Sequence, residues 1–159
     1  MTTKTGVQYQ RFSEDQNLNR IKNFDLRLKK LEQEKRIKDF TDLEVWKNAH
    51  TLVLSVYKLT SKLPKSETFG LISQMQRASV SITSNIAEGF GRQSFKEKIQ
   101  FYYLAHGSLT ELKNQLIICR DLSYISNSDF DKIQNNLITS QKILQGLIRK
   151  SKTFLNPKS

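Results

Sequence analysis

The sequence has a single cysteine, Cys119, among its 159 residues. One thiol cannot form a disulfide within the chain or build a thiolate metal site, so both are excluded as organising features. The sequence also lacks a long apolar run, and no charged N-terminal segment precedes a hydrophobic block. We therefore expect no membrane contact and a reducing, cytoplasmic setting.

Proline and glycine are also scarce, with two prolines and six glycines, whereas Leu, Lys, Gln, Ile and Ser are plentiful. This composition is typical of a helical protein. No segment alternates apolar and polar residues with a period of two, so we predict no sheet.

Apolar residues recur instead every three or four positions in four stretches, which predicts helices over about 42–63, 67–89, 95–123 and 128–154. The connections between them are short, so successive helices must run in opposite directions. The sequence thus predicts an all-α fold, an antiparallel up-and-down four-helix bundle over residues 40–155. Residues 1–39 form a charged N-terminal arm with a narrow apolar stripe, either partly helical or a frayed extension.

Local signals mark the ends of these helices. Thr41 or Asp42 is expected to cap the first helix, and Asn127 or Ser128 the fourth. Ser94 and Glu97 form a capping box before the third helix. The remaining signals are glycines. Gly89 and Gly91 are predicted to end the second helix through positive φ angles, and Gly107 to mark a close crossing with a neighbouring helix.

Basic residues dominate the charge, with 26 Lys and Arg against 15 Asp and Glu, a net charge of +11. Such an excess favours a polyanionic partner, most often nucleic acid, although composition does not separate RNA from DNA or from an acidic protein. The candidate phosphate-binding residues are Arg77, Arg92, Lys96, Lys98, Lys113 and Arg120, together with Lys29, Lys30, Lys35, Arg36 and Lys38 of the arm.

Residues with catalytic potential do not converge in the sequence. His50 and His106 fall on different predicted helices, and neither has a second ligand three or four positions away. The segment GFGR at 89–92 lacks the strand and the remaining residues of a phosphate-binding loop. We therefore predict no catalytic residue, no metal site and no cofactor.

Amides and small hydroxyls replace the expected Lys and Glu along one face of the second predicted helix. The face comprises Gln74, Arg77, Ser81, Asn85 and Glu88. It is either a solvated surface or a hydrogen-bonded interface with another helix or subunit, and the small polar side chains favour the interface.

Three stretches carry a family resemblance: DLEVWKNA, YKLTSKLPKSETFGLISQMQRASVSITSNIAEGFGR and SFKEKIQFYYLAHGSLTEL. They resemble the bacterial four-helix-bundle protein family, also called the 23S rRNA intervening-sequence protein family, over about residues 40–152. The resemblance implies a ring-shaped homopentamer without enzymatic activity. It also implies a fold similar to the accessory protein of diversity-generating retroelements, a basic pentameric barrel that binds nucleic acid and a reverse transcriptase.

The family motif maps onto ten residues of this chain as fold or assembly positions: Gln74, Arg77, Ser81, Asn85, Glu88, Gly89, Arg92, Gly107, Ser108 and Glu111. We expect Asn85 and Glu88 to hydrogen-bond across helices, and Arg92 to meet an anion or a neighbouring subunit.

Two functions remain open. The first is a non-catalytic basic oligomer that binds RNA or DNA through phosphate contacts, as an accessory factor in an RNA- or reverse-transcriptase-related process. The alternative is a protein-interaction scaffold.

Overall fold

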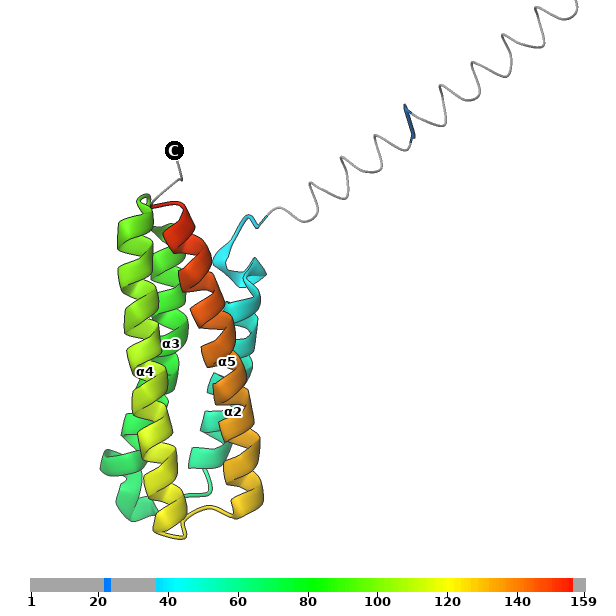
Figure 1. Ribbon diagram of the computed structural model, residues 1–159. Coiled ribbons are helices and arrows are strands. Elements are labelled where there is room, and N and C mark those ends of the chain that lie inside the picture. The colour runs from blue at the N-terminus through cyan, green and yellow to red at the C-terminus, as the bar shows by residue number, and fades with distance from the viewer. Residues whose placement is uncertain (1–21, 24–36, 156–159) are drawn as a thin grey trace, which may run out of the picture. The chain divides into compact units, whose positions relative to one another are not determined.

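The computed structural model describes residues 22–23 and 37–155 (Figure 1). The chain divides into two units, Met1–Ile37 and Lys38–Ser159. In the first unit, Lys22 and Asn23 are exposed helical residues, and Ile37 is exposed outside any helix. The predictions for Lys29, Lys30, Lys35 and Arg36 lie outside the described residues.

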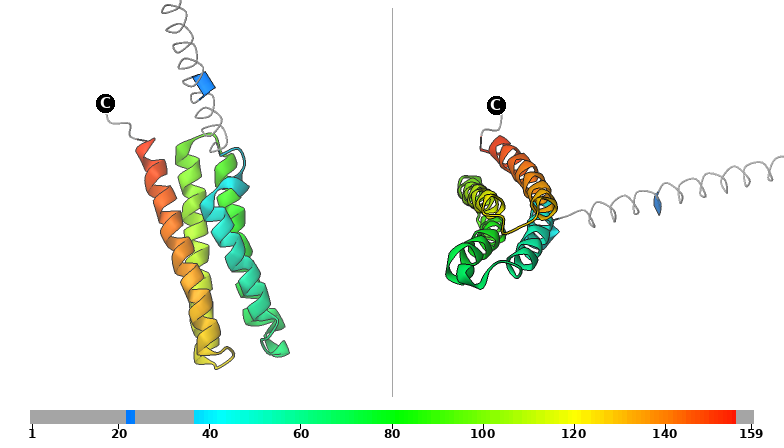
Figure 2. Two further views of the ribbon diagram at one scale, coloured as in Figure 1. Left: turned by 90° about the vertical axis from the view of Figure 1, so that its right-hand side faces the viewer. Right: turned by 90° about the horizontal axis from the view of Figure 1, so that it is seen from below.

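The second unit contains four long helices, and the described residues include no strand. The helices are α2 (Glu44–Thr60), α3 (Ser73–Gly91), α4 (Phe95–Asp121) and α5 (Asn127–Thr153). Consecutive helices run in opposite directions (Figure 1), and each packs against its two neighbours in chain order, with α5 closing onto α2 (Figure 2). The predicted antiparallel four-helix bundle is confirmed. No helix in the described part of the chain is both long and apolar enough to cross a membrane.

The core follows the apolar periodicity of the sequence. In α4 the apolar residues that recur every three or four positions are buried throughout, at Tyr102, Ala105, Leu109, Leu112, Leu116 and Cys119. On α2 the buried face comprises Val45, Ala49, Leu52, Val56 and Leu59, whereas Trp46 is half-buried. Each fully buried aliphatic side chain contributes about 1.5–3 kcal/mol through removal from water, which holds the four helices together.

The start of α4 is capped as predicted. The Ser94 hydroxyl accepts a hydrogen bond from Glu97 N at 3.2 Å and donates one to Glu97 Oε2 at 2.7 Å. The hydrogen bond from Ser94 lowers the pKa of the Glu97 carboxyl.

Two other cap predictions are wrong. The N-cap of α2 is Leu43, which makes no side-chain cap hydrogen bond, and Asp39 caps the short 3-10 helix η1 (Phe40–Asp42) that leads into α2. Ser126, one residue before the predicted Asn127, caps α5.

The second predicted helix begins later than expected, because the chain kinks before it. A 3-10 turn η2 (Lys65–Glu67) and a wide turn η3 (Thr68–Ile72) precede α3, and Gly70 has non-helical angles of φ −99° and ψ −117°. Glu67 Oε2 accepts a hydrogen bond from Leu71 N at 3.1 Å. A Cβ atom on Gly70 would lie 2.6 Å from that oxygen. The carboxylate therefore caps the helical turns in a space that a larger residue would fill.

The end of α4 forms a Schellman motif. Tyr124 N donates to Cys119 O and Ser123 N donates to Arg120 O, both at 2.9 Å. Ser123 takes the left-handed conformation that the motif requires, with φ at 58°. The helix therefore ends at Asp121 rather than at the predicted residue 123.

The roles of the glycines differ from the predictions. No glycine in the described residues has a positive φ, so Gly89 and Gly91 both stay within α3. Nothing lies within 4 Å of a Cβ built on Gly107, so the predicted close crossing inside the bundle is wrong at that position. The close approach occurs at Gly89, where a Cβ would lie 2.7 Å from Tyr102 Cε1 and 3.1 Å from Phe101 Cβ.

Replacement of Gly89 by alanine should therefore separate α3 from α4. We expect Gly89→Ala to lower the free energy of unfolding by about 1–2 kcal/mol, because overpacking against the buried Tyr102 ring outweighs the gain in helix propensity. Urea unfolding followed by circular dichroism measures the change. The matched control is Gly146→Ala in α5, where nothing lies within 4 Å and stability should rise by up to about 1 kcal/mol. Equal stability of the two variants would contradict the close approach.

Candidate nucleic-acid interface

Polar residues of α3 and α4 meet along a line that we call the α3–α4 polar seam. It comprises Gln74, Arg77, Ser81, Asn85, Ser108 and Glu111. Ser81 Oγ and Ser108 Oγ are 2.9 Å apart and join the two helices. One level further along, Arg77 Nη2 lies 4.0 Å from Glu111 Oε1. The structure thus brings together family-motif residues that are about 30 positions apart in sequence.

Two members of the motif bond differently from the prediction. Asn85 Nδ2 donates to Ser81 O at 2.8 Å and to Ser81 Oγ at 3.1 Å, so it reaches α4 only through Ser81. Glu88 forms an ion pair with Arg92, four residues on. The predicted direct bonds from Asn85 and Glu88 across helices are therefore wrong, because partners one turn away in α3 satisfy both side chains.

An outward stripe of α4 lies beside this seam. Leu104, Gly107, Glu111 and Ile118 are spaced by three, four and seven residues, so they share one face of the helix. Leu104 is 56% exposed and Ile118 is 39% exposed. We call these four residues the outer stripe of α4. The outer stripe combines apolar side chains with Gly107, where nothing lies within 4 Å of an added Cβ atom and the helix surface is open.

Three of the six basic candidates are engaged within the bundle. Lys98 Nζ donates to Phe90 O at 2.5 Å and to Gly89 O at 3.5 Å, and burial lowers its pKa. The Arg92 guanidinium lies 4.5 Å from the centre of the Phe101 ring. The Arg120 guanidinium lies 4.6 Å from the Phe130 ring and pairs with the neighbouring Asp121. These three residues serve packing and helix capping.

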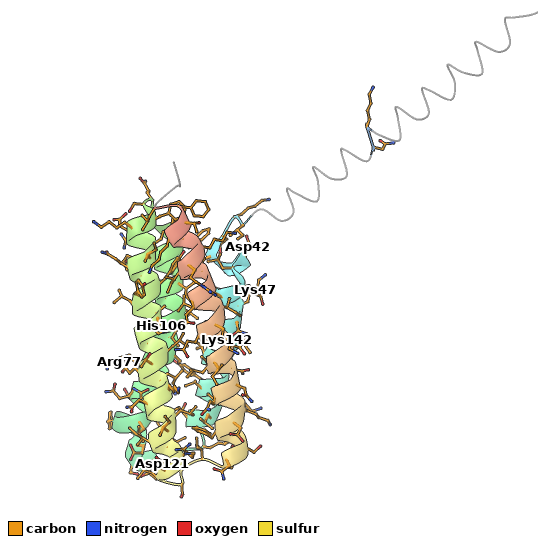
Figure 3. The ribbon with its side chains drawn as sticks, in the orientation of Figure 1. Asp42, Lys47, Arg77, His106, Asp121 and Lys142 are labelled. Carbon is orange, nitrogen blue, oxygen red and sulfur yellow. The ribbon has the colours of Figure 1, made fainter. Side chains whose placement is uncertain are left out.

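The other three candidates are more open to solvent. The Arg77 side chain is 71% exposed, and Lys96 and Lys113 are exposed on α4. Figure 3 shows Arg77 on the outer side of the α3–α4 pair, away from Lys142 on α5. Lys96 and Arg120 stand in the first and last turns of α4, about 36 Å apart at 1.5 Å per residue. The six candidates therefore do not form one patch.

Sequence reasoning missed three lysines that the fold gathers between α2 and α5. A groove of about 380 Å³ is lined by Lys58 of α2, Lys62 of the turn after α2 and Lys132 of α5. The available signal was the spacing of Lys58 and Lys62, which places both on one face of the helix. Periodicity gives no indication that α5 brings a third lysine to the same place.

The side chains that usually carry acid–base or nucleophilic chemistry are used in packing. The His50 ring stacks on Trp46 with centroids 4.9 Å apart. His106 Nε2 lies 3.3 Å from the Gln141 amide nitrogen. Cys119 is buried, and desolvation raises the pKa of its thiol to about 11. Within the described residues, no three His, Cys, Asp or Glu side chains cluster as metal ligands.

The fold and the motif residues define a class of helical-bundle protein, and comparison with known proteins identifies the family. Residues 41–146 match the family model described as 23S rRNA-intervening sequence protein. The chain belongs to this family. In fold it is similar to a crystal structure of a protein of unknown function from the S23 ribosomal protein family of Bacteroides thetaiotaomicron VPI-5482. That similarity has a TM-score of 0.62 and 23% identity, and covers 66% of this chain and 95% of the other. No curated protein matches the chain.

The role of Lys98 can be tested by removing its charge while keeping an apolar stem. We expect Lys98→Met to lower the free energy of unfolding by about 1 kcal/mol, because the last carbonyl groups of α3 lose their donor. Lys96→Met, at an exposed position two residues away, is the control and should leave stability unchanged. Thermal unfolding of both variants measures the difference. A Lys98→Met variant as stable as the control would instead return Lys98 to the phosphate-binding candidates.

Proposed function

We propose that the protein is a non-catalytic homo-oligomer that binds nucleic acid through contacts to phosphates. The observation that carries this proposal is the excess of cationic side chains on the bundle. Residues 38–155 contain sixteen Lys and Arg against ten Asp and Glu. Among the described residues, ion pairs use four of the sixteen: Lys62, Arg77, Arg92 and Arg120. Lys98 is engaged on backbone carbonyl groups, and most of the other positive charges are available to a polyanion.

Family membership supports an association with RNA, since the family is named for an intervening sequence of 23S rRNA. The family resemblance also implies a fold similar to the retroelement accessory protein, and we extend the proposal on that ground to an accessory role in an RNA- or reverse-transcriptase-related process. A cytoplasmic site of action fits the single thiol, Cys119, which has no second cysteine to pair with. No catalytic role is assigned, because His50, His106 and Cys119 all serve packing.

Self-association is the second part of the proposal. The outer stripe of α4 and the adjacent α3–α4 polar seam offer apolar contacts, small residues and hydrogen-bonding groups, as subunit interfaces do. Val80 of α3 is a further apolar residue, 40% exposed. We propose that another copy of the chain covers this surface, with a pentamer as the assembly. Repetition of a modest basic surface around a ring would raise affinity through avidity.

The nucleic-acid part is tested by the dependence of binding on salt. We expect the purified protein to bind labelled RNA or DNA duplexes at about 50 mM salt, with affinity falling roughly a hundredfold or more by about 200 mM, because bound phosphates release counterions. Fluorescence anisotropy measures both quantities. Absence of binding at the lower salt would sink this proposal. The scaffold alternative would then gain support from Phe69, a 95% exposed aromatic side chain suited to a protein partner.

The assembly part is tested by placing a charge on the outer stripe. We expect Leu104→Glu to reduce the mass measured by light scattering from about five times 18.5 kDa to that of one chain, because a carboxylate would be buried without a partner. Leu54→Glu is the matched control, since Leu54 is 59% exposed on α2. It should leave the mass unchanged. The same mass for unmodified protein and Leu104→Glu would show that this stripe is not the interface.

A further inference from the structure

A groove lies on the surface of the bundle between α2 and α5. It lies where α2 ends and α5 begins, and its volume is about 380 Å³. Its walls come from both sides: Ser55, Lys58 and Leu59 from α2, Lys62 from the turn after α2, and Asp129, Lys132, Ile133 and Asn136 from α5. None of the basic residues assigned from the sequence lines it.

The charge of this groove is unbalanced. Three ammonium groups face a space that holds one carboxylate, Asp129, and the Lys62 Nζ to Asp129 Oδ2 distance is 3.4 Å. Lys58 and Lys132 form no ion pair with any residue in the described part of the chain. Like charges repel across a shared space, and an anion placed between them would relieve that repulsion. The groove therefore suits a ligand with negative charge on several oxygens.

The rest of the lining indicates a ligand larger than a bare anion. Leu59 and Ile133, which are 3% and 5% exposed, give the groove an apolar base. Asn136 stands one helical turn after Lys132 and adds an amide to the wall. The volume falls in the range of pockets that hold small organic molecules, so there is room for more than a phosphate. One nucleotide would fit this lining, because its charged phosphate would lie near the lysines and its less polar nucleoside near the apolar base.

We propose that the groove holds one phosphate of a bound nucleic-acid strand between Lys58, Lys62 and Lys132, with the adjoining nucleoside against Leu59 and Ile133. The assignment rests on the proposed function and locates a specific contact for it. The α2–α5 face then carries nucleic acid, while the α3–α4 face carries the subunit contact. Lysine is suited to this role because it acts on phosphate as a point charge.

The first test compares two double variants with the same loss of charge. Lys58→Gln/Lys132→Gln removes groove charges, and Lys47→Gln/Lys142→Gln removes charges from the same two helices outside the groove. We expect the groove variant to bind RNA about tenfold more weakly, with the slope of log affinity against log salt reduced by about one. The control should lose about threefold or less. Both are measured by fluorescence anisotropy on the full chain.

A second test works in the opposite direction. Asp129→Asn removes the negative charge from the groove and frees Lys62, so binding should become about threefold tighter or more. Asp131→Asn, two residues away in the first turn of α5 but outside the lining, gives the same change in net charge and should have a smaller effect. Equal effects of the two substitutions would show that only net charge matters and would overturn the assignment.

The remaining outcomes are also decisive. Lys58→Arg/Lys132→Arg keeps the charges and should bind within about threefold of the unmodified protein. A tenfold loss in that variant, or equal losses in the two glutamine variants, would overturn the groove while leaving the proposed function intact. Failure of the unmodified protein to bind any nucleic acid at about 50 mM salt would overturn the proposed function and this assignment together. Circular dichroism confirms that each variant is folded.

Discussion

The approach of α3 to α4 at Gly89 constrains the arrangement of the whole bundle. With no side chain on Gly89, the Tyr102 ring can occupy the space where a Cβ would stand 2.7 Å away. At that spacing the Ser81 and Ser108 hydroxyls meet at 2.9 Å, and Arg77 comes within 4.0 Å of Glu111. A wider separation would break the Ser81–Ser108 hydrogen bond and leave Ser108 Oγ with only its bond to Leu104 O within α4, at a cost of about 0.5–1.5 kcal/mol. Close packing and polar pairing therefore depend on one small residue.

The bundle divides its surface between two helix pairs. Because each helix packs against its neighbours in chain order, the α3–α4 pair and the α2–α5 pair lie on opposite sides of the core. The first pair presents apolar and small polar side chains, whereas the second presents lysines around a groove. A chain that used one side to contact its own copies would keep the other free for a charged ligand.

The fold was largely predictable from the sequence, and the reason is visible in α4. Its buried residues repeat at helical spacing, so local pattern and core position agree. The kink before α3 was not predictable, because Glu67 holds it in place while its other carboxylate oxygen accepts a hydrogen bond from Tyr124 OH at 3.3 Å. That partner lies 57 positions away in sequence. The surroundings of the glycines also depend on contacts that the sequence does not show, since only the structure distinguishes the crowded Gly89 from the open Gly107.

The candidate site was less predictable than the fold. Counting basic residues found the excess of positive charge but not its location. Lys98, taken as a phosphate contact, donates to the Phe90 carbonyl group instead. Conversely, nothing in the sequence distinguishes Lys58 and Lys132 from other lysines, because their shared groove exists only once α2 and α5 are paired. The net charge can be counted from the sequence, but which charged residues share a surface depends on how the helices pack.

Three polar contacts in the middle of α5 determine its register. Ser140 Oγ donates to Asn48 Oδ1 of α2 at 2.6 Å, and His106 of α4 lies 3.3 Å from Gln141 and 3.4 Å from Gln145. Aliphatic side chains that repeat with similar spacing would tolerate a slide of α5 by one turn, but these hydrogen bonds would not. The height of the groove along the bundle is thereby fixed relative to the α3–α4 polar seam. Every copy of the chain presents its two faces in the same alignment.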